Sequence, residues 1–428
     1  MRLIPAQKVA GRLRLPGDKS ISHRAALIAA LSTGSSEISN FSTGRDCAST
    51  ISCLRDLGIS IESKQGKLFF PGGQKLTSPR KSLDCGNSGS TLRILAGVLA
   101  GHDLTAELIG DESLSSRPMR RIIEPLKLMG AQIEATDGKA PLKIRGAKEL
   151  TPITYTLPIA SAQVKSAILF AGLNARGRTT VIETSPTRDH TERLFNGFGV
   201  PVTTNPDLSV TLEGPARFTS GAITIPGDIS SAAYFVAAAM LLPESELTIG
   251  GVGLNPTRSA FLSVLNSWGA SISTSDLRTD RNEPYGTIKV RGGINQIGDR
   301  QSTIGNNLIP SLIDELPLLA VVGSQIEGGI RIRDAAELRH KESDRLATTA
   351  QNLRAMGVEV EEFEDGLSVF GPTRLRGALI DSHGDHRIAM AFSIAALIAD
   401  GETEIAGAEC VAISFPEFFD LLHSVTVR

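Results

Sequence analysis

Two kinds of hydrophobic pattern alternate along the chain. In the first, a helical pattern ends in a large apolar residue followed by glycine, and an alternating apolar and polar run comes next. Glycine just after a helix is the usual left-handed C-cap, and alternation with period two indicates a strand with one buried face. The pattern occurs as LGISIES from Leu57, MGAQIEA from Met129, FGVPVTT from Phe198, WGASIST from Trp268 and MGVEVEE from Met356.

The second pattern is rich in Ala and Leu and is apolar almost all round, which predicts buried helices. Each copy follows a turn containing Ser or Gly. Together with the first pattern it gives a repeating strand–helix–strand–helix–strand unit, in six copies. The predicted starts of these helices lie near Ser20, Asn87, Ser161, Ser230, Asp314 and Asp385.

A longer repeat divides the chain in two. The segment LPGDKSISHRAALIAAL from Leu15 matches IPGDISSAAYFVAAAML from Ile225, about half of the 428 residues further on. A chain of this length favours two domains. We therefore predict α/β domains over residues 15–226 and 227–428. The strand in residues 1–14 is expected to complete a sheet of the second domain. The cleft between two such domains is the expected place of the site.

The charge balance excludes a strong general attraction to nucleic acid or to a membrane surface, because 44 basic residues face 46 acidic ones. The longest apolar stretch, 232–242, is too short to span a bilayer. The N-terminal residues resemble neither a signal nor a transit peptide. The four cysteines form no C-x-x-C pair, so we expect free thiols, no metal and a cytoplasmic protein.

Candidate ligand-binding residues of the first half cluster at predicted helix starts. Lys19 and Arg24 lie at the first, where a cation opposes the helix dipole unless an anion binds there; alternatively Ser20 only caps the helix. Asp84–Arg93 contains small residues that let backbone approach a ligand, although a plain capped turn is the preferred interpretation of this segment alone. Arg117 belongs to a basic segment in which a solvated face is the preferred interpretation for Arg120 and Arg121. The last helix start offers Ser161, Gln163 and Lys165, with capping by Ser161 as the alternative.

The second half adds ionisable clusters around Asp314, at 339–345 and at 383–388. A helix would place Lys341 and Arg345 on one face, where surface salt bridges are the alternative to function. We expect seven cations to meet in one cleft, with Asp314 and Glu342 beside them for proton transfer. No metalloprotease, nucleophile-elbow, phosphate-loop or dinucleotide motif occurs. The seven cations are Lys19, Arg24, Arg117, Lys165, Lys341, Arg345 and Arg387.

Eight segments together resemble 5-enolpyruvylshikimate-3-phosphate (EPSP) synthases, in order and over nearly the whole chain. They read LPGDKSISHRA, GNSGST-LR, SSRPM, SAQVKSA, IDELP, LRHKESDRL, HGDHRIAM and SFPEFF. The stretches TPITYTLPIASAQVKSA, TRDHTE and NPTR are most similar to the bacterial subclass that includes glyphosate-tolerant members. The resemblance implies two similar inside-out α/β domains of three βαβαββ units each.

The resemblance also implies the reaction and its residues. The enolpyruvyl group of phosphoenolpyruvate would pass to the 5-hydroxyl of shikimate 3-phosphate by addition and elimination, without metal or cofactor and in a monomer. Asp314 would act as base, Glu342 as proton donor and acceptor, and Lys19 would share this proton traffic. Shikimate 3-phosphate would contact Lys19, Ser20, Arg24, Ser161, Ala162, Gln163, Arg188, Asp314 and Lys341. Phosphoenolpyruvate would contact Lys19, Gly89, Arg117, Gln163, Arg345 and Arg387.

Two positions depart from the family pattern. Some members carry a Lys shortly before the SFPEFF-like segment, whereas Cys410–Phe415 contains none. Gly89 stands where tolerant members have Ala, so glyphosate is a possible inhibitor. Two alternatives are a UDP-N-acetylglucosamine enolpyruvyl transferase, which would have Asn after the first Lys and a loop Cys, and a non-catalytic anion-binding protein, for which two acids left unpaired beside the anion would bring no gain.

Overall fold

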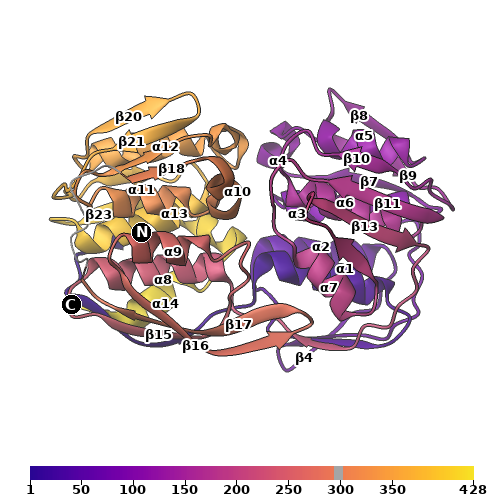
Figure 1. The fold of residues 1–428 in the computed structure, drawn as a ribbon, viewed down its shortest axis with the longest axis horizontal. Helices are drawn as coiled ribbons and strands as arrows, with labels where there is room; N and C mark the ends of the chain where they lie inside the picture. Colours follow the sequence, from indigo (N-terminus) through magenta and orange to yellow (C-terminus); the bar gives the residue numbers. More distant parts are fainter. Residues whose placement is uncertain (294–301) are drawn as a thin grey trace. The chain divides into compact units, whose positions relative to one another are not determined.

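The computed structural model describes residues 1–293 and 302–428, and these form two compact units. Unit 1 comprises Met1–Leu15, Gly227–Arg278 and Pro284–Arg428, and unit 2 comprises Pro16–Pro226 and Thr279–Glu283. Figure 1 colours them by sequence, unit 2 in indigo to magenta and most of unit 1 in orange to yellow.

Unit 2 contains three four-stranded sheets among its described residues, in the orders β14-β3-β5-β4, β6-β7-β9-β8 and β10-β11-β13-β12. In each, two parallel neighbours are followed by an antiparallel hairpin. The strands are β3 (Ser36–Ser39), β4 (Glu62–Lys64), β5 (Lys67–Phe70), β6 (Leu83–Asp84), β7 (Thr105–Ile109), β8 (Gln132–Thr136), β9 (Lys139–Arg145), β10 (Thr154–Thr156), β11 (Gly177–Ile182), β12 (Val202–Thr204), β13 (Ser209–Gly214) and β14 (Ala222–Thr224). The helices are α1 (Lys19–Leu31), α2 (Arg45–Asp56), α3 (Gly89–Ala100), α4 (Glu112–Ser116), α5 (Arg120–Leu128), α6 (Ala162–Gly172) and α7 (His190–Gly197).

Unit 1 has sheets in the orders β16-β17-β15-β2-β24, β18-β19-β21-β20 and β1-β23-β22 within the described part of the chain. Its strands are β1 (Arg2–Leu3), β2 (Lys8–Arg14), β15 (Glu246–Gly253), β16 (Ser271–Asp280), β17 (Glu283–Arg291), β18 (Ser302–Ile304), β19 (Ile330–Ile332), β20 (Val360–Phe363), β21 (Gly366–Val369), β22 (Leu379–Asp381), β23 (Thr403–Ala406) and β24 (Thr426–Val427). Its α-helices are α8 (Ile229–Leu241), α9 (Ala260–Ser267), α10 (Ile309–Leu312), α11 (Leu316–Gly323), α12 (Arg345–Ala355), α13 (His386–Ile398) and α14 (Phe418–Val425), and its 3₁₀ helices are η1 (Asn306–Leu308), η2 (Ala336–His340) and η3 (Ala408–Ile413).

The six predicted repeat units therefore correspond to six sheets in the described residues, each with its helices. The Ala-rich helices α1, α3 and α6 lie inside unit 2, and α8, α11 and α13 lie inside unit 1, where nearly every side chain is buried. Close packing of α3 on α6 requires Gly97, because a Cβ there would overlap the backbone of Ala167. The sheets cover these helices and expose one face, as β9 shows by strict alternation.

The five glycines of the first pattern end their helices as predicted. Each has a positive φ, from 82° to 108°, which favours glycine over any residue with a Cβ. Strands β4, β8, β12, β16 and β20 follow them. The glycines are Gly58, Gly130, Gly199, Gly269 and Gly357.

Two strands pair far from their sequence neighbours. Strand β2 near the N-terminus pairs in parallel with β15 of unit 1. Strand β14, at the end of unit 2, pairs in parallel with β3 and so provides the first strand of that unit's first sheet. The sequence analysis did not predict this second pairing, because β14 is short and carries one buried residue, Ile223.

The tip of the β16–β17 hairpin, Thr279–Glu283, belongs to unit 2. Arg281 lies over the Phe198 ring, with 4.9 Å between its guanidinium carbon and the ring centroid. The buried Glu283 carboxylate lies 2.7 Å from His190 Nδ1. Within the described ranges, no helix is both long and apolar enough to cross a membrane. The four cysteines are free and buried.

Candidate functional site

The first helix of unit 2 presents Lys19, Ser20 and Arg24 on its first two turns. Asp18 caps this helix by accepting from the Ile21 N–H at 2.9 Å, so the alternative in which Ser20 is the cap is wrong. The Lys19 Nζ lies 2.9 Å from Asp46 Oδ2. Ser20 Oγ instead accepts from Arg188 Nη1 at 3.4 Å. The Ser20 hydroxyl therefore contacts Arg188 and does not cap the helix.

Arg24 is buried and fixed in direction by three hydrogen bonds. It donates to Thr191 Oγ1 at 2.7 Å, to the Ser20 carbonyl at 2.9 Å and to Ser166 Oγ at 2.7 Å. Burial lowers its pKa to about 10, although the charge of Glu192 acts in the opposite direction. At neutral pH the guanidinium keeps its charge and can hold an anion near the start of α1.

A second group in unit 2 surrounds the start of α3. Ser88 caps this helix, and Gly89 is its first residue. Gln163 joins two neighbours, since it accepts from Arg93 Nη1 at 2.7 Å and donates to Ser90 Oγ at 2.9 Å. A Cβ on Gly89 would lie 2.7 Å from Arg93 Nη1.

Arg117 belongs to the same group. Its Nη2 donates to Asn87 Oδ1 at 2.8 Å, and its Nη1 would lie 3.5 Å from a Cβ on Gly89. Arg117 is buried, whereas Arg120 is exposed, so the solvated-face alternative applies to Arg120 and not to Arg117. The sequence analysis included Arg93 in a candidate segment but assigned it no ligand contact, although its position one helical turn after Gly89 could have indicated that the two lie close together.

Ser161 caps α6 by accepting from the Val164 N–H at 3.4 Å, and Ala162 is the first residue of that helix. The prediction that Lys165 joins the ligand-binding cations is wrong. Its side chain is 1% exposed, and its Nζ lies 2.9 Å from Glu183 and 2.6 Å from Glu192. Burial alone would lower the Lys165 pKa, but the two carboxylates outweigh it and raise the pKa.

In unit 1, Arg345 is the centre of a buried ionic cluster. Its Nε lies 2.7 Å from Asp385 Oδ2, its Nη2 lies 2.6 Å from Glu342 Oε2, and its Nη1 lies 3.4 Å from Asp314 Oδ1. Burial by itself would lower its pKa, yet the charges of Asp385, Glu342 and Asp314 raise it. This arginine therefore contacts both predicted proton-transfer acids. The two acids are paired with it, whereas the sequence analysis treated them as unpaired.

The predicted helix through Lys341 and Arg345 is wrong. Lys341 follows the short helix η2, and α12 begins only at Arg345 with Asp344 as its cap. The Asp344 carboxylate accepts a hydrogen bond from the Ala347 N–H at 3.0 Å, so Asp344 caps a new helix and interrupts the predicted one. Lys341 Nζ pairs with Glu337 at 2.9 Å, on its own side of this break.

Arg387 extends the cluster around Asp314. Its Nη2 lies 3.7 Å from Asp314 Oδ2. Burial opposes its charge, but Asp314 and other neighbours raise its pKa. Burial also raises the pKa of Tyr234 to about 12, against the lowering effect of Arg387. The sequence analysis missed Arg258, which lies 3.8 Å from Asp314 Oδ2, and its partner Glu315.

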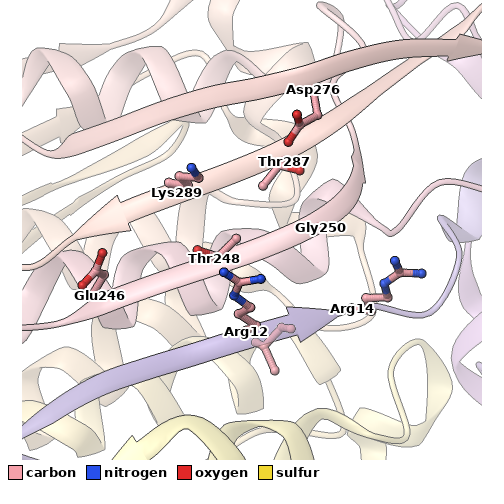
Figure 2. A pocket seen from close by; sticks show the side chains of 9 residues that line it. Arg12, Arg14, Glu246, Thr248, Gly250, Asp276, Thr287 and Lys289 are labelled. Atoms are coloured by element: carbon pink, nitrogen blue, oxygen red, sulfur yellow. The ribbon is translucent and has the colours of Figure 1, made fainter.

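A hollow of about 490 Å³ lies elsewhere in unit 1, on the outer face of the five-stranded sheet (Figure 2). Arg12 and Lys289 flank Thr248 there, each on a neighbouring strand of β15. None of the predicted site residues lines it. It is therefore not the cavity that the Asp314 cluster would use.

Comparison with known proteins matches the sequence and the fold of this chain to one family. The family model described as EPSP synthase (3-phosphoshikimate 1-carboxyvinyltransferase) matches residues 4–422. A 3-phosphoshikimate 1-carboxyvinyltransferase of Koribacter versatilis (strain Ellin345) is 51% identical, over 100% of this chain and 99% of the relative. Another of that name, from Synechocystis sp. (strain ATCC 27184 / PCC 6803 / Kazusa), is 49% identical over 98% and 95%.

Solved structures agree. The EPSP synthase of Acinetobacter baumannii has a TM-score of 0.88 and 39% identity, covering 100% of this chain and 98% of that one. The enolpyruvyl transferase NikO of Streptomyces tendae has a TM-score of 0.78 at 18% identity, covering 99% and 96%, which shows the shared fold alone.

Proposed function

The chain belongs to the EPSP synthase family, the 3-phosphoshikimate 1-carboxyvinyltransferases, and we propose that the three residue clusters described above, at the start of α1, at the start of α3 and around Arg345, carry out the reaction of that family. The enzyme transfers the enolpyruvyl group of phosphoenolpyruvate to the 5-hydroxyl of shikimate 3-phosphate and releases phosphate. The 5-hydroxyl oxygen adds to C2 of the enol phosphate while the methylene carbon gains a proton, and elimination then breaks the C–O bond to phosphate and removes a proton from the methyl group, which leaves the enol ether.

Shikimate 3-phosphate is assigned to the residues around the start of α1. Lys19 and Arg24 supply positive charge, and Ser20 and Arg188 are already joined by a hydrogen bond. Arg24 is held by Thr191 and Ser166, which supports a fixed direction for phosphate binding. The remaining assigned contacts are Ser161, Ala162, Gln163, Asp314 and Lys341.

Phosphoenolpyruvate is assigned to the group around Gly89. Arg117 and Gln163 bring a cation and an amide to the start of α3, where Gly89 has no side chain and the guanidinium groups of Arg93 and Arg117 come close to its Cα. The guanidinium of Arg93, bonded to Gln163, extends this group. Lys19, Arg345 and Arg387 are the further assigned cations, and fixed cations of this kind stabilise the charge that moves onto phosphate.

The proton-transfer roles rest on one observation, namely that Arg345 contacts both Asp314 and Glu342 in the buried cluster of unit 1. A guanidinium at this distance stabilises a carboxylate, which is the form that Asp314 requires as a base and that Glu342 requires when it takes a proton back on elimination. Asp314 takes the proton of the 5-hydroxyl. Glu342 gives a proton to the methylene carbon on addition and takes one back on elimination, with Lys19 sharing this transfer.

Release of phosphate from phosphoenolpyruvate tests the proposal directly. We expect release that depends on shikimate 3-phosphate and does not occur with UDP-N-acetylglucosamine in its place. Asp314→Ala should lose turnover by at least about a hundredfold while calorimetry still detects binding of shikimate 3-phosphate. Preserved turnover in this variant would refute the role of Asp314 as the base.

Lys19→Met provides a second test, because one ammonium is assigned to two anionic substrates. We expect calorimetry to show weaker binding of both substrates, by about tenfold or more. Arg120→Met is the matched control, since Arg120 is an exposed cation of the same unit. Unchanged affinities in Lys19→Met would remove Lys19 from the site.

Three finer features remain part of the proposal. We place the chain near the subclass with glyphosate-tolerant members, yet we expect glyphosate to inhibit it, because Gly89 leaves room where a methyl group would crowd the inhibitor. We also propose a monomer, which sedimentation would test. A cytoplasmic location agrees with four free cysteines.

A further inference from the structure

A tight turn in unit 1 directs Arg258 into the interior. In the turn Asn255–Arg258, Asn255 Oδ1 accepts from the Thr257 N–H at 2.9 Å, and the Asn255 carbonyl accepts from the Arg258 N–H at 2.9 Å. Arg258 is only 3% exposed. A buried guanidinium is costly unless it is paired, so its partners indicate why it is there.

One nitrogen of Arg258 faces two consecutive carboxylates. Its Nη2 lies 3.3 Å from Glu315 Oε1 and 3.8 Å from Asp314 Oδ2. Ser230 joins them, because its hydroxyl donates to Glu315 Oε1 at 2.5 Å and contacts Arg258 Nη2. Glu315, at 2% exposed, is more deeply buried than Asp314. Arg258 therefore neutralises a buried acid directly beside the proposed base.

We propose that Arg258 is a positioning residue for Asp314, acting with Glu315 as a buried ion pair that directs the Asp314 carboxylate and keeps it ready to accept a proton. This inference rests on the proposed role of Asp314 as the base. Arg258 and Arg387 both face Asp314 Oδ2, while Arg345 faces Oδ1. The carboxylate is thus held from two directions.

The charges around this pair give the expected pH effect its sign. Asp314 faces Arg258, Arg345 and Arg387; Glu342 and Asp385 act on it through Arg345, and Tyr234 and Asp228 through Arg387. Removing the positive charge of Arg258 leaves the negative Glu315 beside Asp314. The loss of the positive charge and the uncompensated negative charge of Glu315 both disfavour ionised Asp314 and so raise its pKa. Turnover should therefore require a higher pH.

Arg258→Gln is the main test. We expect kcat to fall about tenfold or more, with KM for both substrates changed less than about threefold, and the acidic limb of the kcat profile to move to higher pH. In Arg258→Gln/Glu315→Gln both charges are gone, so the acidic limb should return toward its original pH while kcat recovers only in part. Arg258→Lys, which keeps the charge, should restore the pH profile.

A purely structural role gives a different result. In that case Arg258→Gln would melt at a lower temperature, yet the folded protein would keep its kcat and pH profile, and this outcome would overturn the proposal. Emission from Trp268, the single tryptophan and a buried residue of unit 1, reports folding of each variant. Arg333→Gln, in which a half-exposed ion pair of the same unit is broken, is the matched control and should leave kcat unchanged.

Asp314→Asn separates failure of this inference from failure of the proposed function. If Asp314→Asn retains turnover, then the role of Asp314 itself is wrong. If Asp314→Asn is inactive while Arg258→Gln keeps both kcat and the pH profile, then the base is correctly assigned and only the positioning role of Arg258 is refuted.

Discussion

Gly89 is the residue at which one methyl group tests the group around Arg117. The added Cβ would lie 2.7 Å from Arg93 Nη1, so the Arg93 guanidinium must move away from Gln163. We expect Gly89→Ala to weaken glyphosate binding about tenfold and to raise KM for phosphoenolpyruvate less. Gly250→Ala is the control, because a methyl group there meets open space. Phosphate-release assays give the inhibition constant of glyphosate and the KM for phosphoenolpyruvate. The prediction is contradicted if neither value changes in Gly89→Ala.

Lys165 shows how a buried cation can look functional in sequence yet serve the fold. Its removal in Lys165→Met would leave Glu183 and Glu192 buried without their common partner. We expect a loss of about 3–5 kcal/mol in the free energy of unfolding, measured by urea titration. At low temperature the folded variant should keep its KM values. A large rise in KM with unchanged stability would return Lys165 to the ligand-binding residues.

Among single residues, the sequence correctly indicated that Lys19 and Arg24 lie in the first turns of a helix, and their roles as ligands stay predictions. It could not predict pairs whose members are far apart, because a burial partner is set by the fold. The sequence at the start of α6 does not show that Glu183 and Glu192 pair with Lys165. The sequence around Glu315 likewise does not show that Arg258 is its partner. Asp344 misled the helix prediction because a capping carboxylate ends one element and begins another.

At the scale of elements, helix ends were the most predictable feature, because glycine at C′ has a simple steric cause. Gly130 isolates this cause, since its φ is 108° and an added Cβ would meet no atom within 4 Å. We expect Gly130→Ala to cost ~1 kcal/mol through backbone conformation alone. The same change at Gly250, where φ is not positive, should cost less, and equal losses at both positions would contradict the C-cap explanation.

At the scale of the whole molecule, the sequence predicted six units and a sheet of the second domain that includes the N-terminal strand, but it named neither β15 as the partner of β2 nor β3 as the partner of β14. The Leu15 and Ile225 repeats mark where the chain passes between units 1 and 2. A short strand with one buried residue carries too little periodicity to indicate its sheet. The parallel pairing of β14 with β3 completes the sheet β14-β3-β5-β4. No local sequence pattern indicates this pairing.

The N-terminal strand should be essential for unit 1 and not for unit 2. Strand β2 lies between β15 and β24, and Leu3, Val9 and Leu13 are buried in the core of unit 1. Deleting residues 1–14 removes this apolar area, at about 1.5–3 kcal/mol for each large side chain, and leaves β15 paired only with β17. Trp268 emission should then shift to the red in buffer, while part of the helical circular dichroism remains and melts separately because unit 2 keeps its own core. Adding a peptide of residues 1–14 should restore the emission, whereas unshifted emission in the deleted chain would show that β15 holds its sheet without β2.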